Sequence, residues 1–326
     1  NTDELAPLVP RAYRSASPAG STFKTFVGFA ALETGKIKPS TEFDCPTGIQ
    51  VGDHTFKNWK KVGAGNLNFV EALTQSCNTW FYQVALKIGA EPIISYSHRL
   101  GLGRRSGIPL RAENEGNIPT DEYMKRVHNR VIKRGDVANM AIGQGDILVT
   151  PLQMAQAMGV LATGGVFHQT RLVKQVQSLD NKVVAAYPDR IREQIPVAPE
   201  VDKALREALQ DVVYDGNGTA RQAQVKGVRV AGKTGTAQWG PTNKQRTAAW
   251  FTGFMPAENP EYAFAAVYEG DPNDNSVHGG SHAAPIIGKV FKEIYKLRKI
   301  REGVPLNPEE EKDESKDEAV PMDESN

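Results

Sequence analysis

The chain has 326 residues, of which 40% are hydrophobic and 24% charged, and its formal net charge is +1. This is ordinary globular composition, with length for one large catalytic domain or two small ones. The charge is near zero and no basic stripe with interleaved aromatic residues is present, which argues against a nucleic-acid partner. No run of about 18 uncharged apolar residues is present to span a bilayer.

The first predicted helix covers residues 21–32, where apolar residues recur at i, i+3, i+4 and i+7 from Phe23. Gly35 and Pro39 then end it. A second helical stretch begins at Asn68. A third begins at Thr150-Pro151-Leu152-Gln153, where a capping threonine, a first-turn proline and a glutamine three residues on form a capping box. Gly164-Gly165 stops this helix.

The C-terminal half is predicted to contain strands as well as helices. An amphipathic helix at 201–213 is followed by three strand-like runs, 228–238, 248–254 and 262–268, whose short connections permit antiparallel pairing. A closing helix is predicted at 283–300. Helices first, then an antiparallel sheet, then a helix predict an α+β fold with helices on the sheet faces. We expect residues 1–302 to form the folded domain and residues 303–326, rich in Glu, Asp and Lys, to be a disordered acidic tail.

Ser21 and Lys24 are the first candidate catalytic pair. Lys24 is the only charged residue of the predicted helix, and a partly buried ammonium is costly unless it is paired or neutralised. The two residues are three apart, so they share a helical face, and a lysine of lowered pKa can take a serine proton. Ser21 also stands in the first turn, where free N–H groups favour an oxyanion. Taken alone, the pair is better explained as a capping serine and a snorkelling lysine.

Two further motifs are individually weak. Ser76-Cys77-Asn78 offers a hydroxyl and an amide that could relay a proton and hold a substrate, but it also fits a helix cap. Lys233-Thr234-Gly235-Thr236 lies on a predicted strand, where a peptide could add by main-chain hydrogen bonds and a carboxylate could bind. The plainer interpretation of this run is a polar strand with a surface lysine. In this order along one chain, however, the three motifs are the signature of serine β-lactamases and penicillin-binding proteins.

The chain resembles the transpeptidase domain of class B penicillin-binding proteins, most closely the rod-elongation group, penicillin-binding protein 2. The resemblance runs from about Pro18 to Ile300. Besides the three motifs it includes the following segments: Gly107–Leu110, Gly116–Thr120, Ile142–Gly145, Thr150-Pro151, Ala249–Phe251 with Gly253-Phe254, and Gly279-Gly280 leading to Ala283–Pro285. It implies an antiparallel sheet flanked by helices with an all-helical subdomain, the penicillin-binding protein and serine β-lactamase fold.

The resemblance also implies residue roles. Ser21 is expected to be the nucleophile, Lys24 its general base, and Ser76 the carrier of the proton to the leaving amine. Asn78, Lys233, Thr234, Gly235 and Thr236 are expected to bind substrate, and the backbone N–H groups of Ser21 and Thr236 to form an oxyanion hole. The implied reaction cross-links peptidoglycan stem peptides through an acyl-enzyme that β-lactams also form. No cofactor is expected.

The resemblance has departures. Ser17-Pro18-Ala19 stands where an aromatic residue and two prolines are expected, and Asn78 where elongation members more often have Asp. Many relatives hold a structural zinc, but the corresponding positions here are Asp44 or Cys45, Asn58, Ala64 and Cys77. Four good ligands are not available, so we expect no metal. Two cysteines are too few for a disulfide scaffold. A Cys45–Cys77 disulfide in an oxidising periplasm and two free buried thiols both remain open.

The expected setting also comes from the resemblance. The protein would work on the periplasmic face of the bacterial inner membrane, held by an N-terminal anchor and joined to a non-catalytic module that this chain does not contain. A first residue that is Asn rather than Met fits a processed or excised chain. A SEDS-family glycosyltransferase and the elongation complex are the expected partners.

Two other functions share the motifs. A β-lactam hydrolase would need a further base for the deacylating water, and Glu113, Glu115 and Glu122 are candidates by position only. A β-lactam sensor or inactive scaffold is the non-enzymatic alternative, although the intact Ser21, Lys24 and Lys233 argue against an inactive scaffold. We expect His278 and His282, which flank a glycine loop, to be bystanders.

Overall fold

A computed structural model describes residues 8–302 except 241 and 275. The predicted tail at 303–326 lies outside the described residues. The described part is α+β, as predicted, and its architecture is set by a three-stranded antiparallel sheet of order β11-β10-β9. Its strands are β9 (Ala231–Trp239), β10 (Arg246–Met255) and β11 (Tyr262–Glu269).

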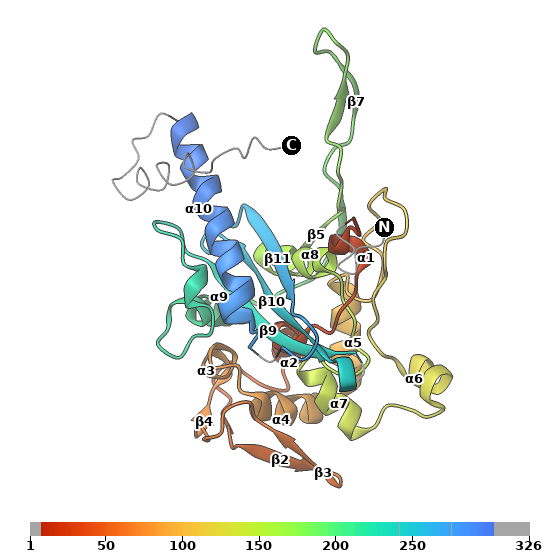
Figure 1. The fold of residues 1–326 in the computed structure, drawn as a ribbon, viewed down its shortest axis with the longest axis vertical. Coiled ribbons are helices and arrows are strands. Elements are labelled where there is room, and N and C mark those ends of the chain that lie inside the picture. The colour runs from red at the N-terminus through yellow and green to blue at the C-terminus, as the bar shows by residue number, and fades with distance from the viewer. Residues whose placement is uncertain (1–7, 241, 275, 303–326) are drawn as a thin grey trace, which may run out of the picture.

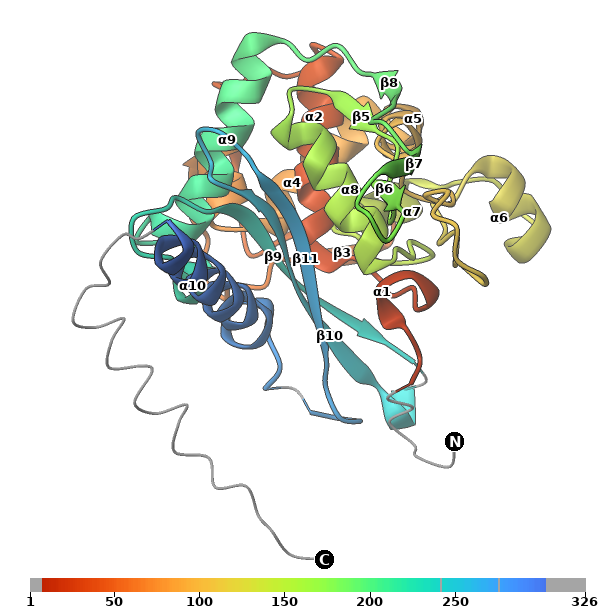
Figure 2. The same ribbon diagram turned by 90° about the horizontal axis from the view of Figure 1, so that it is seen from above.

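The central strand β10 is buried on both faces. Trp250 and Phe254 belong to one hydrophobic core, whereas Phe251 and Met255 belong to a second one on the other side. This follows from the two-residue period of a strand, since every residue from Thr247 to Met255 is buried. The first core lies among most of the helices, and the second lies under α10 (Ala284–Arg301). Figure 2 shows α10 on one side of the sheet and α8 and α2 on the other.

The predicted helices are all present, with shifts of one or two residues at their ends. The segment predicted as a helix from Ser21 begins as a 3₁₀ turn, η1 (Gly20–Phe23), and continues as α2 (Lys24–Glu33). Helix α3 (Phe69–Thr74) is capped by Asn68, and α8 (Pro151–Ala162) has the predicted Thr150–Gln153 capping box. The amphipathic helix is α9 (Pro199–Tyr214).

The remaining elements were not predicted individually. The other helices are α1 (Arg11–Arg14), α4 (Asn78–Ile88), α5 (Ala90–Arg99), α6 (Asp121–His128), α7 (Arg134–Ala141), the 3₁₀ turns η2 (Arg221–Ala223) and η3 (Thr242–Lys244), and the π-helical turn η4 (Gly279–Ala283). The small strands are β1 (Phe43–Asp44), β2 (Gly48–Val51), β3 (His54–Lys57), β4 (Asn66–Leu67), β5 (Val166–His168), β6 (Gln175–Gln177), β7 (Val183–Ala186) and β8 (Ile191–Gln194).

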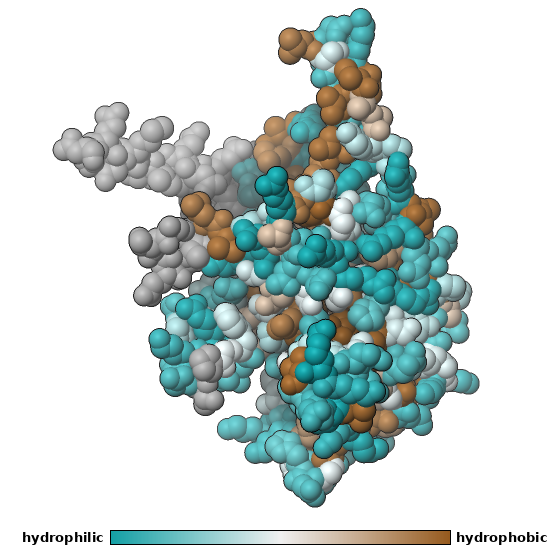
Figure 3. Space-filling view, turned by 90° about the vertical axis from the view of Figure 1, so that its right-hand side faces the viewer, coloured by the Kyte–Doolittle hydropathy of each residue, from teal (hydrophilic) through white to brown (hydrophobic). Residues whose placement is uncertain are grey.

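Two small β-structures stand apart from the main sheet (Figure 1). The flap, residues 43–67, contains the pairs β2–β3 and β1–β4 and covers the start of α4. The arm, residues 171–190, is a β6–β7 ribbon that projects from the body and has no buried residue. Figure 3 shows hydrophobic surface along the arm up to its tip, where Leu179 is fully exposed.

Candidate active site

Ser21 reaches the surface, unlike the residues around it in the η1 turn and the first part of α2. All residues from Ser17 to Leu32 are buried except Ser21, which is partly exposed. The turn is fixed from behind because the Gly20 N–H donates to the Gly143 carbonyl at 3.0 Å. Gly143 lies so close that a Cβ there would be 2.3 Å from the Gly20 carbonyl oxygen. The fold therefore presents a single hydroxyl on a rigid, otherwise buried turn.

Lys24 lies one turn further, fully buried, and its ammonium is directed at the Ser76–Asn78 segment. Its Nζ donates to the Ser76 carbonyl at 2.8 Å, to Ser76 Oγ at 3.1 Å and to Asn78 Oδ1 at 2.5 Å. Burial lowers the Lys24 pKa well below its usual value, and the positive charge of Lys233 lowers it further. A lysine of lowered pKa gives up its proton more readily and can act as a base.

Ser76 joins α3 to α4 in an uncommon backbone conformation. Its φ is +57°, in the left-handed region that side chains other than glycine seldom adopt. Its N–H donates to the Leu73 carbonyl at 3.1 Å, and the next residue, Cys77, is the N-cap of α4, with its sulfur accepting from the Trp80 N–H. Strained backbone of this kind persists where the surroundings fix it, and it is concentrated at functional sites.

The third motif lies on β9, the edge strand of the sheet nearest to Ser21. Lys233 is fully buried, which lowers its pKa to about 7. The Thr234 hydroxyl shares a 2.6 Å hydrogen bond with the Thr219 hydroxyl. Thr236 is exposed, and its Oγ1 accepts from the Gly279 N–H at 3.2 Å. Buried amine and hydroxyl groups on one strand can hold a carboxylate-bearing ligand.

Two glycines bring β9 and the η1 turn into backbone contact. A Cβ at Gly20 would lie 2.8 Å from the Thr236 carbonyl oxygen and 3.1 Å from its nitrogen. A Cβ at Gly235 would lie 2.8 Å from the Ala19 carbonyl oxygen and 3.0 Å from the Thr22 nitrogen. The peptide groups of Ser21 and Thr236 are therefore neighbours, which is the arrangement that an oxyanion hole made from two N–H groups requires.

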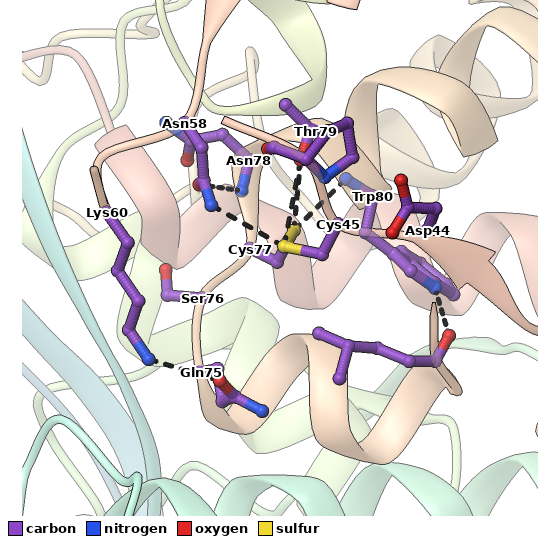
Figure 4. Close-up of a disulfide and its surroundings, with 12 residues drawn as sticks. Asp44, Cys45, Asn58, Lys60, Gln75, Ser76, Cys77, Asn78, Thr79 and Trp80 are labelled. Atoms are coloured by element: carbon purple, nitrogen blue, oxygen red, sulfur yellow. Dashed lines mark hydrogen bonds between the residues drawn. A yellow bond between two sulfur atoms is a disulfide. The ribbon is translucent and has the colours of Figure 1, made fainter. Parts of the chain in front are cut away.

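Cys45 and Cys77 form a disulfide, with their Cα atoms 6.4 Å apart (Figure 4). This resolves the choice left open by the sequence between a disulfide and free thiols. Asn58 lies beside the bridge, and its Nδ2 donates to Cys45 Sγ at 3.5 Å. The described residues contain no cluster of three or more His, Cys, Asp or Glu that could hold a metal.

The side chains considered for other roles have partners of their own. Glu113 is buried and accepts from the Ser106 N–H at 2.7 Å, and Glu115 lies 4.0 Å from Arg105. Glu122 is an exposed residue in the first turn of α6. His282 stacks on Tyr268 with ring centroids 5.1 Å apart.

Sequence reasoning missed two contributors to the site. The indole Nε1 of Trp59 donates to the Ser76 carbonyl at 3.1 Å, and the N–H of Asn78 donates to Asn58 Oδ1 at 3.0 Å. Trp59 carries no local sequence signal, and the resemblance singled out Asn58 only as the counterpart of a metal-ligand position, because each residue acts through a fold-dependent contact.

Comparison with known proteins gives a consistent result. The family model described as the penicillin binding protein transpeptidase domain matches residues 1–296. The chain is 33% identical over 306 residues to the peptidoglycan D,D-transpeptidase MrdA of Haemophilus influenzae, a match that covers 89% of this chain and 46% of that protein.

Solved structures of penicillin-binding proteins are also similar to this chain. In the complex of penicillin-binding protein 2 with MreC from Helicobacter pylori, the similar chain is 30% identical, with a TM-score of 0.76 and coverage of 90% of this chain and 52% of that one. The ceftriaxone acyl-enzyme of penicillin-binding protein A from M. tuberculosis is 26% identical, with a TM-score of 0.77 and coverage of 89% and 63%. The chain thus spans about half the length of the curated relative and less than two thirds of both structures.

Proposed function

Because the chain belongs to the penicillin-binding protein transpeptidase domain family, we propose that it is a peptidoglycan D,D-transpeptidase that works through an acyl-enzyme on Ser21. The observation that carries this proposal is the buried Lys24 ammonium, held by Ser76 and Asn78 and carrying a lowered pKa. A capping serine with a surface lysine would show neither the burial nor these contacts.

In the acylation step, Ser21 Oγ attacks the carbonyl carbon of the peptide bond between two D-alanines while neutral Lys24 takes the hydroxyl proton. The oxygen of the tetrahedral intermediate is held by the N–H groups of Ser21 and Thr236. The C–N bond then breaks, and Ser76 passes a proton to the departing amine. Ser76 suits this step because its Oγ lies 3.1 Å from the Lys24 nitrogen.

Deacylation follows the steps of acylation in reverse order. An amine from a neighbouring stem peptide attacks the Ser21 ester and gives up a proton through Ser76 to Lys24, the C–O bond breaks, and Lys24 returns the proton to the Ser21 oxygen. Asn78 positions the substrate amide, and Lys233, Thr234, Gly235 and Thr236 bind the terminal carboxylate along β9. Lys233 has a pKa of about 7 when no ligand is bound, and a bound carboxylate would favour its charged form.

The proposal extends to inhibition, partners and location. β-Lactams would acylate Ser21 and remain, as ceftriaxone forms an acyl-enzyme with the M. tuberculosis relative. The helices of the described part are all too short or too polar to cross a bilayer. We place the enzyme at the periplasmic face of the inner membrane, anchored by a segment outside this chain. MreC is a candidate partner because the H. pylori relative forms a complex with it, and family resemblance adds a SEDS glycosyltransferase.

Incubation with a fluorescent penicillin tests the proposal. The protein should be labelled covalently, intact mass should rise by one penicillin, and proteolysis should place the adduct on Ser21. Ser21→Ala should abolish the label. Absence of label on the folded wild-type protein would contradict the proposal, and rapid, sustained nitrocefin turnover would favour a hydrolase instead.

A further inference from the structure

We propose that Asn58 is a positioning residue for the reaction, and that it transmits the placement of the disulfide-linked flap to Asn78 and Ser76. This inference rests on the proposed function. It adds a residue that has no part in the three sequence motifs and lies 18 positions before the nearest of them, Ser76.

The side-chain amide of Asn58 uses both of its ends. Oδ1 accepts from the Asn78 N–H at 3.0 Å, and Nδ2 donates to Cys45 Sγ at 3.5 Å (Figure 4). Its backbone N–H donates to the Thr47 carbonyl at 2.8 Å, which fixes the residue within the flap. One planar group therefore connects the disulfide to the residue whose Oδ1 contacts the Lys24 ammonium.

The contact with Asn78 satisfies a specific need of helix α4. Asn78 is the first residue of this helix, so its N–H has no partner within the helix. The preceding residue, Cys77, caps the Trp80 N–H and leaves the Asn78 N–H to Asn58. Without that acceptor the first turn can fray, and the Asn78 side chain would lose its fixed direction towards Lys24.

The neighbouring residue holds the other side of the same motif. Trp59 Nε1 donates at 3.1 Å to the Ser76 carbonyl, which also accepts from Lys24 Nζ at 2.8 Å. Asn58 and Trp59 thus bind the two backbone groups that flank Cys77. Ser76, at φ +57°, needs such external contacts to keep its conformation.

The flap is held in place by more than its own strands. Isolated two-stranded pairs are marginally stable in water, and β2–β3 and β1–β4 are both of this kind. The Cys45–Cys77 disulfide ties the flap to the start of α4, and the Thr79 hydroxyl donates to the Pro46 carbonyl at 2.9 Å beside it. Asn58 is therefore presented to Asn78 from a fixed platform.

The test compares Asn58→Ala with Asn58→Asp. The Ala variant loses the acceptor for the Asn78 N–H, and its second-order rate constant for penicillin acylation should fall roughly 10- to 100-fold. The Asp variant keeps the acceptor and should recover to within about threefold at high pH. Its carboxylate would stabilise the Lys24 ammonium, so the rising limb of its pH–rate profile should move to higher pH.

Asn68→Ala is the matched control, since it removes a capping side chain from the adjacent helix α3 without touching Asn78. It should destabilise the protein while leaving the acylation rate and its pH profile unchanged. Wild-type acylation by Asn58→Ala, or an unshifted pH profile in Asn58→Asp, would overturn the inference.

A second measurement does not depend on activity. Amide hydrogen exchange over residues 76–80 should be faster in Asn58→Ala than in the wild type and unchanged in Asn68→Ala. If wild-type protein is not labelled by penicillin, the proposed function fails. The exchange result then decides separately whether Asn58 fixes this turn, and unchanged exchange in Asn58→Ala would contradict the inference.

Discussion

Gly20 and Thr236, 216 positions apart in the sequence, are in backbone contact, and a single added Cβ on Gly20 would come within 2.8 Å of the Thr236 carbonyl oxygen. The contact joins the turn that carries Ser21 to the strand that carries the Lys233–Thr236 motif. Since Gly20 also has φ +56°, both space and backbone conformation require glycine at this position.

Gly20→Ala should therefore separate β9 from the η1 turn and move the Thr236 N–H away from the reacting carbonyl. We expect acylation by fluorescent penicillin to fall by roughly 100-fold or more, the cost of losing one oxyanion donor. Gly35→Ala is the control because Gly35 has a similar φ of +66° but no atom within 4 Å of the added Cβ. It should lose about 1 kcal/mol of stability and keep its acylation rate.

Lys24→Arg should abolish acylation, although it retains the positive charge. A guanidinium is not deprotonated in proteins, whereas Lys24 has a pKa lowered by burial and by Lys233. Stopped-flow measurement of the acyl-enzyme should show a loss of at least about 1,000-fold, and exposed Lys38→Arg should behave as wild type. A Lys24→Arg rate within tenfold of wild type would disprove the general-base role.

Lys233 should make stability depend on pH. Burial lowers its pKa to about 7, whereas an unfolded lysine titrates near about 10.4. Between these values the unfolded state binds more protons, so the free energy of unfolding rises with pH. The cost of burying the ammonium is fully present below pH 7 and disappears as the pH rises towards 10.

The measurement is urea unfolding of wild type and Lys233→Met at pH 6.5, 8 and 9. Relative to the Met variant, the wild type should gain up to about 1.4 kcal/mol per pH unit above pH 7. Exposed Lys289→Met should follow the wild-type pH dependence. Parallel curves for wild type and Lys233→Met would mean that Lys233 keeps an ordinary pKa.

The arm should be dispensable for folding and acylation. It has no buried residue, and its base is closed by the hydrogen bond from the Gln169 N–H to the Arg190 carbonyl at 2.7 Å. Replacing residues 174–187 with an Asn-Gly turn should leave penicillin acylation within about twofold of wild type. Among cuts within residues 8–302, limited proteolysis should cleave this segment first. Loss of acylation in a folded deletion variant would show that the arm supports the site.

Regular elements with strong local signals were predictable from the sequence. The Thr150–Gln153 capping box was predicted from capping chemistry, and the strands of the main sheet from strand-like apolar runs, although β9 begins three residues later than the predicted run at 228–238. The flap and the arm were not, because their strands of two to four residues are too short for a periodic pattern, and the arm has no buried residue.

The candidate site also has residues that could be predicted from the sequence and contacts that could not. The motifs identified the candidate residues. In the structure, Lys24 contacts Ser76 and Asn78, and the η1 turn lies against β9. The contacts that Asn58 and Trp59 make with the Ser76–Asn78 segment could not be predicted, since a side-chain hydrogen bond to a distant backbone group leaves no trace in sequence spacing. The sequence also could not decide whether Cys45 and Cys77 are paired, because pairing depends on the distance between Cα atoms in the fold.

Because the sheet lies between two separate hydrophobic cores, substitutions far from Ser21 should also disturb the candidate site. Strand β9 is aligned by β10, and β10 places Trp250 in one core and Phe251 in the other. A cavity opened beneath α10, for instance at Phe291, would tilt the shared strand and so disturb Lys233 from the opposite side of the molecule. Screens for conditional, temperature-sensitive alleles should thus recover substitutions in this C-terminal helix as readily as ones beside the nucleophile.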